Sequence, residues 1–142
     1  MIQRIQSLYL LLATLVSACL LYIPLFELPA IAADQAPRAF MISSSALLLI
    51  LNAAIGILAF VVIFLFKNRS LQLKACRLIL ILIFILIGLL FYTSDTLSNG
   101  LDQKLIFKIG TYLPLLQVIF IFLAHRGIKK DDALVRSADR LR

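Results

Sequence analysis

The sequence predicts an all-α integral membrane protein: a four-helix bundle with both termini in the cytoplasm and a short amphipathic helix at the C-terminus. Of the 142 residues, 63% are hydrophobic and only 15% are charged, whereas about a quarter of the residues in a soluble domain are charged. Four stretches without charge are long enough to cross a bilayer, and Lys and Arg are divided unequally among their connections. A soluble bundle is the alternative, but helices that are apolar on every side leave no polar face for water.

The first predicted span covers about residues 5–26, an uncharged run of 22 residues. Within it, the four residues from Val16 to Cys19 resemble the site at which bacterial lipoproteins are cut and lipidated. A mature lipoprotein leaves its anchor through polar residues, but here the apolar run continues past Cys19 to Phe26. The sequence therefore favours an intact first span, and lipidation of Cys19 stays open as the alternative.

Three further spans are predicted at about residues 43–66, 75–94 and 106–124. The second span lies in an uncharged run of 28 residues, and the third and fourth contain uncharged runs of 17 and 16 residues. The two shorter runs are at the lower edge of the length that crosses a bilayer. Arg77, Lys104 and Lys108 flank them, and their long stems can lie along the lipid tails while the charges reach the interface. We therefore count all three as spans.

The outer connections and one proline give further expectations. Residues 27–42 contain Pro29 and Pro37 and are expected to form an ordered turn or a short surface segment. Residues 93–100 contain Ser, Asp, Asn and Gly and predict a second outer turn. Pro114 lies one turn into the fourth span and removes a backbone donor, so that a kink is expected there.

The distribution of basic residues predicts the orientation. The N-terminus, the second loop and the tail hold eleven of the 14 Lys and Arg residues, and the two outer loops hold three. Because Lys and Arg favour the cytoplasmic side, we expect a multi-pass membrane protein with both ends in the cytoplasm. The net charge of +7 then belongs mainly to one face, where anionic head groups attract basic residues by about 1 kcal/mol each. Nucleic acid is not needed to explain this charge and is not expected as a partner.

The sequence lacks a group of residues that suits catalysis or metal binding. No ionisable side chain lies near the middle of a predicted span, which argues against a proton relay or an ion pump. The outer carboxylates have no nucleophile, metal-binding His or phosphate-binding loop beside them. Cys19 and Cys76 have no neighbouring His or acidic residue, and His125 is expected to anchor its helix at the interface. We therefore predict no enzyme, and no catalytic, cofactor-binding or metal-binding residue.

Two amide side chains near mid-membrane, Asn52 and Gln117, allow two interpretations. Asn52 and Gly56 are four residues apart and share one helix face, a pattern that lets helices approach closely and hydrogen-bond for about 1 kcal/mol. Packing within the bundle or toward another membrane protein is the first interpretation. The alternative is a small-solute transporter or channel with a polar pocket near Asn52 and Gln117. A water-filled cavity at mid-membrane would favour the alternative, and a dry, close-packed bundle would not.

The last segment, residues 127–142, differs from the spans in being charged. Its Leu134, Ala138 and Leu141 follow the helical spacing i, i+4, i+7. Acidic residues in the first turn and basic residues in the last suit the helix dipole; they are Asp131, Asp132, Arg140 and Arg142. A helix of about eleven residues is too short to be stable alone in water. The segment is therefore expected to dock on lipid head groups, on the protein's own second loop or on a cytoplasmic partner.

Both ends of the chain resemble a known family. MIQRIQSLYLLL at residues 1–12 and RGIKKDDALVRSADRLR at residues 126–142 are similar to the start and finish of the bacterial domain-of-unknown-function 4293 family. The resemblance implies a small four-span membrane protein without an assigned activity. Asp132 departs from the family pattern, in which Glu is expected. The residues that the resemblance implies as part of the pattern are Arg126, Lys130, Asp131, Leu134, Arg136, Ser137, Asp139, Arg140 and Arg142.

Together these observations predict a four-span bundle over residues 1–126 and a cytoplasmic tail over residues 127–142. We expect a non-catalytic accessory or scaffold subunit of a larger assembly in the bacterial inner membrane, with the tail and the basic second loop as its cytoplasmic docking face. It would contact membrane lipids and other membrane or cytoplasmic proteins, or a second copy. A head-group anchor needs only basic charge, whereas the family pattern implies a fixed order of residues, which favours a specific docking site. The predicted contact residues are Arg126, Lys129, Lys130, Asp131, Asp132, Arg136, Ser137, Asp139, Arg140 and Arg142.

Overall fold

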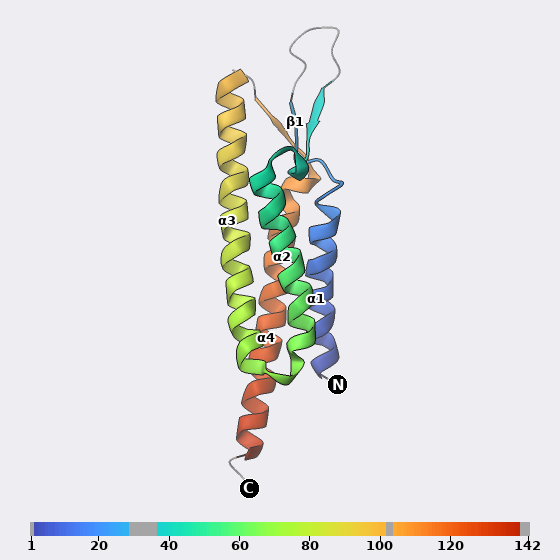
Figure 1. Ribbon diagram of the computed structural model, residues 1–142, viewed down its shortest axis with the longest axis vertical. Helices are drawn as coiled ribbons and strands as arrows, with labels where there is room; N and C mark the ends of the chain where they lie inside the picture. The colour runs from blue at the N-terminus through green and yellow to red at the C-terminus, as the bar shows by residue number, and fades with distance from the viewer. Residues whose placement is uncertain (1, 29–36, 102–103, 140–142) are drawn as a thin grey trace.

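Four long helices lie side by side in the computed structural model, which describes residues 2–28, 37–101 and 104–139 (Figure 1). They are α1 (Ile2–Cys19), α2 (Ala46–Phe64), α3 (Arg69–Leu101) and α4 (Leu113–Asp139). Helix α1 packs against α2 and α4, and α3 packs against the same two helices. Each helix therefore has two neighbours around a common core. The mostly helical fold that the sequence predicts is confirmed.

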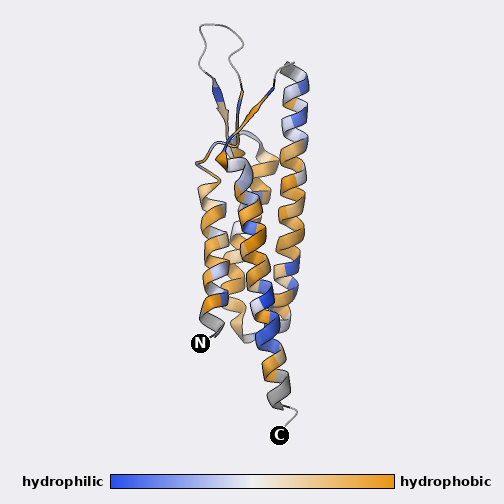
Figure 2. Ribbon diagram, turned by 180° about the vertical axis from the view of Figure 1, so that it is seen from behind, coloured by the Kyte–Doolittle hydropathy of each residue, from blue (hydrophilic) through white to orange (hydrophobic). Residues whose placement is uncertain are grey.

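The bundle is apolar on its outside as well as in its core. Buried aliphatic side chains from all four helices, such as Leu10, Ile55, Ile83 and Ile121, form the core. Many large hydrophobic side chains are also exposed on the outside of the bundle. Hydrophobic residues predominate along the middle of the helices, whereas hydrophilic residues gather near their ends (Figure 2). Helices that are apolar on all sides suit a lipid environment. Helices α2, α3 and α4 are each long and apolar enough to cross a membrane, and the apolar part of α1, Ile5–Cys19, is shorter. The chain has the helices of a membrane protein.

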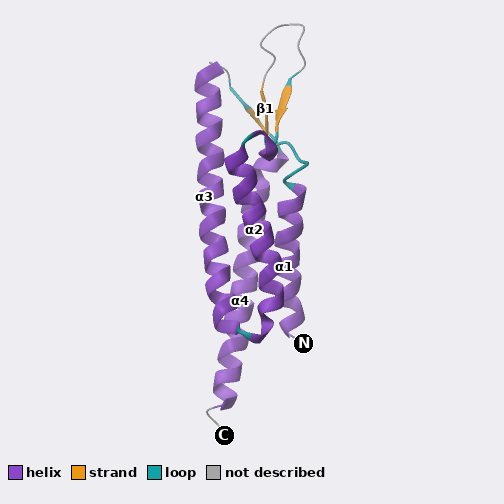
Figure 3. Cartoon of the chain, viewed as in Figure 1, coloured by secondary structure: helices purple, strands orange, loops and turns teal. Residues whose placement is uncertain are grey.

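A small antiparallel sheet covers the end of the bundle away from the chain termini (Figure 3). Strand β1 (Phe26–Leu28) lies between β2 (Arg38–Phe40) and β3 (Ile106–Phe107). The rings of Phe26 and Phe40 stack with 4.6 Å between their centroids, and Phe107 meets Phe26 edge-on at 6.4 Å. These three rings join segments that are far apart in the sequence.

The sheet corrects the all-α prediction and the end of the first span. Helix α1 ends at Cys19, although a span to residue 26 was predicted, and the chain then turns into β1. Strands of two or three residues are too short to show an alternating pattern, so the sequence indicated only a turn or surface segment here. Residues 29–36 of that segment lie outside the described residues.

Helix α3 is longer than the predicted span 75–94 and includes the turn predicted at residues 93–100. The polar side chains there bond within the helix: Thr96 Oγ1 donates to the carbonyl of Tyr92 at 2.9 Å, and Asn99 Nδ2 donates to Asp95 Oδ2 at 3.2 Å. Such local hydrogen bonds satisfy polar groups without ending the helix. The polar composition that predicted a turn therefore marks only the exposed end of α3.

The predicted kink at Pro114 is wrong, because Pro114 lies in the first turn of α4. A proline in the first turn removes a backbone donor that has no partner within the helix anyway. The short 3₁₀ helix η3 (Ile109–Tyr112) precedes α4, and two more such turns, η1 (Ile42–Ser44) and η2 (Leu65–Lys67), flank α2. Pro114 therefore marks where α4 begins.

Candidate functional site

Helix α4 continues past its predicted end as one unbroken helix to Asp139. It extends beyond the other helices at the end of the bundle where α1 begins (Figure 1). The short separate helix predicted for residues 127–142 is therefore wrong for residues 127–139. Gly127 lies within α4 and packs closely against α1, since a Cβ at this position would be 2.9 Å from Cγ of Gln6. Asp131 and Asp132 consequently lie within α4 and not in a first turn.

The part of α4 around Asp131 is attached to the start of α3. Arg69 Nη2 lies 3.2 Å from Asp131 Oδ2, and Arg69 Nη1 donates to the backbone carbonyl of Asp131 at 3.4 Å. The two side chains are 27% and 18% exposed, so water screens this pair less than a fully exposed one. The sequence left three docking surfaces open: lipid head groups, the second loop and a cytoplasmic partner. The structure shows a contact with Arg69, which the sequence assigned to the second loop and which begins α3.

A double-mutant cycle will measure this attachment. We expect Arg69→Ala and Asp131→Ala to show a coupling of about 1 kcal/mol in the free energy of unfolding in detergent, because each variant alone removes the same ion pair. The coupling should shrink at high salt. Lys74→Ala, which removes an exposed charge on the same helix, is the control and should be additive with Asp131→Ala. Additive effects of Arg69→Ala and Asp131→Ala would contradict the attachment.

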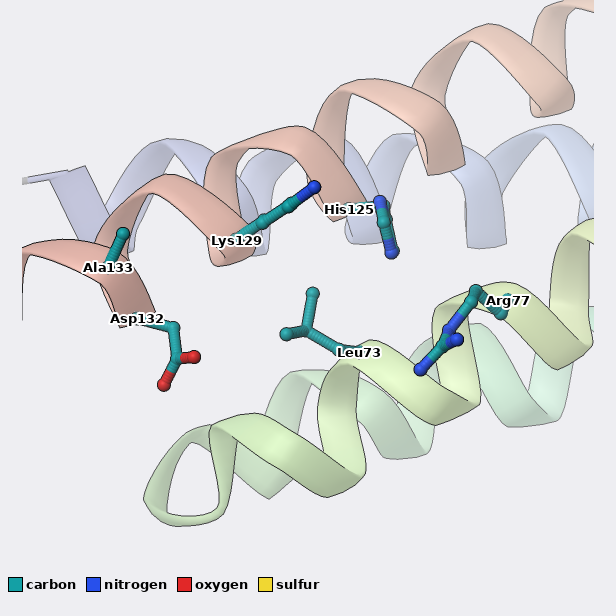
Figure 4. A pocket seen from close by; sticks show the side chains of 6 residues that line it. All are labelled: Leu73, Arg77, His125, Lys129, Asp132 and Ala133. Atoms are coloured by element: carbon teal, nitrogen blue, oxygen red, sulfur yellow. The ribbon is translucent and has the colours of Figure 1, made fainter. Parts of the chain in front are cut away.

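A charged cleft of about 430 Å³ lies between α3 and α4 at this end of the bundle. It is lined by Leu73, Arg77, His125, Lys129, Asp132 and Ala133 (Figure 4). Arg77 and His125 lie at one end of the cleft and Asp132 at the other, with Leu73 between them (Figure 4). We call this set of six residues the α3–α4 cleft.

The electrostatics of the α3–α4 cleft favour an anion at its His125 end. The apolar run of α4 ends at Ala124, so His125 lies just beyond it. Partial burial lowers the pKa of His125, and the positive charges of Arg77 and Lys129 lower it further. An anion near these three side chains would be attracted by the positive charges of Arg77 and Lys129 and would make protonation of His125 more favourable.

The structure separates the predicted contact residues. Lys129 and Asp132 line the α3–α4 cleft, Asp131 bonds to Arg69, and Arg126 and Lys130 are exposed. The others lie where side chains are not described, or beyond the described residues: Arg136, Ser137, Asp139, Arg140 and Arg142.

Sequence reasoning did not pair individual residues of α3 and α4 at this site. It placed Arg77 at the flank of a span and in the basic second loop, which was expected to join the tail in one cytoplasmic docking face. It assigned His125 only to anchor its helix. A signal was nevertheless present: Arg77 precedes the apolar run of α3, and His125 follows the apolar run of α4. Two neighbouring antiparallel helices bring such boundary residues to the same level.

A second polar cluster lies inside the bundle. Gln117 Nε2 donates to Ser17 Oγ at 2.7 Å, and Asn52 Nδ2 donates to the backbone carbonyl of Ser17 at 3.0 Å. All three side chains are buried. Gly56 permits the close approach of α2 to α1, since a Cβ there would be 2.9 Å from Cβ of Ser17. The cluster joins α1 to α2 and α4, as expected for polar and small residues at a helix interface.

Two acceptors of this cluster, Asn52 Oδ1 and Gln117 Oε1, are buried without a hydrogen-bond partner among the described residues. A groove of about 250 Å³ lies beside the cluster between α1 and α2. Its lining includes Ser17 and Asn52 of the cluster and also Thr14, but is otherwise mostly apolar, with residues such as Leu21 and Ile57. The two amides therefore meet on Ser17 of α1, a residue that the sequence did not single out among the small polar residues of the spans.

At the sheet end, the charged groups make local contacts. Lys108 Nζ lies 2.9 Å from Glu27 Oε2, which ties β1 to the start of the segment leading into α4. Asp95 accepts a hydrogen bond from Asn99 within α3, and Asp102 lies outside the described residues. Within residues 2–28, 37–101 and 104–139 there is no group of three or more His, Cys, Asp or Glu side chains that could hold a metal ion.

The fold and these contacts define a small multi-helix membrane protein with a polar cluster inside the bundle and a charged end beyond it. The chain belongs to the family described as domain of unknown function (DUF4293), whose model matches residues 2–141. This match confirms the resemblance of the two ends, and the family has no assigned activity. Neither a curated protein nor a solved structure matches the chain.

Proposed function

We propose that the protein is a non-catalytic accessory or scaffold subunit of a larger assembly in the bacterial inner membrane, with both chain ends in the cytoplasm. The observation that supports this function is the projection of α4 beyond the other helices to Asp139 (Figure 1). Leu134 and Val135 on this part are 50% and 41% exposed. We call residues 133–139 the projecting end and propose that it contacts a partner protein.

The attachment of α4 to the bundle makes the projecting end suitable for docking. It continues a helix of 27 residues, so it does not have the instability of a short isolated helix. The contact between Arg69 and Asp131 holds the helix just before the projecting end. A surface that is ordered before binding loses less conformational entropy when a partner binds.

The charge distribution supports a cytoplasmic position of the projecting end. Helices α1 and α4 place the N-terminal and C-terminal ends of the described chain at the same end of the bundle (Figure 1). Eleven of the 14 Lys and Arg residues belong to the segments predicted at that end. Basic residues favour the cytoplasmic side of the membrane.

The proposal is tested by co-purification in mild detergent. We expect the triple variant Arg136→Ala, Asp139→Ala, Arg140→Ala to insert into the membrane normally and to lose a co-purifying protein at least about tenfold, as removal of a charged contact at an interface predicts. The control is Arg38→Ala, Asp95→Ala, Lys104→Ala, which removes the same charges at the opposite end of the bundle. An unchanged set of co-purifying proteins in the first variant would contradict the proposal.

A small-solute transporter or channel is the second candidate. The side-chain oxygens of Asn52 and Gln117, which have no hydrogen-bond partner within the described part of the chain, favour it, because they would be acceptors for a polar solute. Against it, the two side chains are only 1% and 0% exposed, and both amides donate to Ser17. The second candidate therefore needs a further conformation in which this cluster opens.

A further inference from the structure

The α3–α4 cleft presents three nitrogen-bearing side chains from two helices. Arg77 comes from α3, and His125 and Lys129 come from α4 (Figure 4). A guanidinium group donates two parallel hydrogen bonds to a phosphate, and an ammonium group adds a positive charge. Neutral imidazole still donates one hydrogen bond. The His125 end of the cleft therefore suits a phosphate group.

The position of the cleft along the bundle indicates where this phosphate comes from. Arg77 and His125 are the first polar residues at this end after the apolar runs of α3 and α4. Ile81 lies one turn after Arg77, and Phe122 lies one turn before His125, on the same helix faces. These two side chains are 56% and 54% exposed. A lipid with its phosphate in the cleft would lay an acyl chain along Ile81 and Phe122.

The carboxylate of Asp132 suits a ligand that carries a positive charge in addition to its phosphate. Asp132 lies seven residues beyond His125 on α4, about 10 Å farther along the helix axis at about 1.5 Å per residue. The cleft thus changes from positive near the apolar surface to negative away from it (Figure 4). In an amine-bearing phospholipid the order is the same: the acyl chains come first, then the phosphate, then the ammonium group.

We propose that the α3–α4 cleft binds the head group of an amine-bearing phospholipid such as phosphatidylethanolamine. Arg77, His125 and Lys129 bind its phosphate, and Asp132 binds its ammonium group. The volume of about 430 Å³ lies within the range of ligand sites, roughly 300–1,000 Å³. This site does not depend on the proposed function of the projecting end. The four side chains that bind the head group lie outside the projecting end, and the ligand is a lipid and not a protein.

The test measures lipid bound to the full-length protein by native mass spectrometry in mild detergent. The probes are phosphatidylethanolamine, phosphatidylglycerol, and inorganic phosphate as a competitor. We expect phosphatidylethanolamine to bind more tightly than phosphatidylglycerol, and phosphate to compete only weakly. Equal binding of the two lipids would overturn the role of Asp132. If phosphate competes at the same concentration as the lipid, the proposal that the ligand is a phospholipid is overturned, and the cleft is assigned to soluble phosphate.

Variants locate the binding in the cleft. We expect Arg77→Gln with Lys129→Gln to weaken phosphatidylethanolamine binding at least about tenfold, as loss of charge-assisted hydrogen bonds predicts. Asp132→Asn should remove the preference for phosphatidylethanolamine and leave phosphatidylglycerol binding unchanged. The control is Lys130→Gln, which removes an exposed charge next to Lys129 but outside the cleft.

Two outcomes would overturn the site itself. One is that Lys130→Gln weakens binding as much as the double variant of Arg77 and Lys129 does, which would show a general effect of charge near the membrane. The other is unchanged lipid binding in the double variant of Arg77 and Lys129. Helix content and thermal unfolding of each variant are measured alongside, so that loss of binding is attributed to the cleft only in a folded protein.

Discussion

Replacing Gly110 with alanine is expected to destabilise the protein by about 3 kcal/mol, the upper part of the usual cost of overpacking. Gly110 is buried in η3, just before α4. A Cβ at this position would overlap the backbone carbonyl of Pro24 and lie 2.9 Å from its carbonyl carbon. A backbone carbonyl cannot rotate away as the end of a side chain can. The added methyl group therefore separates the start of α4 from the segment after α1.

This separation also affects hydrogen bonds beside Gly110. Lys108 N donates to the carbonyl of Leu25 at 2.9 Å, and the hydroxyl of Thr111 donates to the same carbonyl. Both bonds join the segment before α4 to the segment before β1. Displacing one from the other weakens both bonds, so the effect is expected to exceed that of the methyl group alone.

Thermal unfolding in mild detergent, followed by circular dichroism, measures the effect of Gly110→Ala. The control is Gly88→Ala in α3, because a Cβ at Gly88 has no heavy atom within 4 Å. Alanine has the higher helix propensity, so Gly88→Ala is expected to be neutral or to stabilise by up to about 1 kcal/mol. Equal unfolding midpoints for Gly110→Ala and the unchanged protein would show that the close approach to Pro24 is not required.

Replacing Ser17 with alanine is expected to cost about 1–2 kcal/mol, because it leaves a buried amide without its partner. Gln117 Nε2 donates to Ser17 Oγ, and Gln117 Oε1 already has no partner among the described residues. In the variant, the whole amide group of Gln117 would be unsatisfied inside the bundle. Asn52 keeps its bond, since its acceptor is the backbone carbonyl of Ser17.

The matched control is Thr14→Ala, which lies on the same helix. Thr14 Oγ1 donates to the carbonyl of Leu10 within α1 at 3.0 Å, so its removal leaves no side chain on another helix unsatisfied. Gln117→Leu should cost less than Ser17→Ala, because the freed Ser17 hydroxyl can bond back to its own helix. Adding Gln117→Leu to Ser17→Ala should recover stability. If Ser17→Ala is no more harmful than Thr14→Ala, the interhelical bond does not stabilise the bundle.

The candidate site was predictable only in part. The charge of residues 127–142 indicated a functional surface at this end, and Lys129 and Asp132 were among its predicted contact residues. The cleft that contains them needs Arg77 from α3. Which residue of α3 faces Lys129 depends on how the two helices are rotated about their axes, and neither apolar run determines that rotation, because both runs are apolar on every side.

The sequence by itself determined the class of this protein, the four helices and the excess of positive charge at one end. These properties depend on composition and on the length of apolar runs, which act within each segment. Tertiary structure alone decided that Ser17 accepts hydrogen bonds from both Asn52 and Gln117, that Phe26 joins β2 and β3, and that Gly127 packs against α1. Each of these depends on a contact between segments distant in the chain, and no local pattern specifies such a contact.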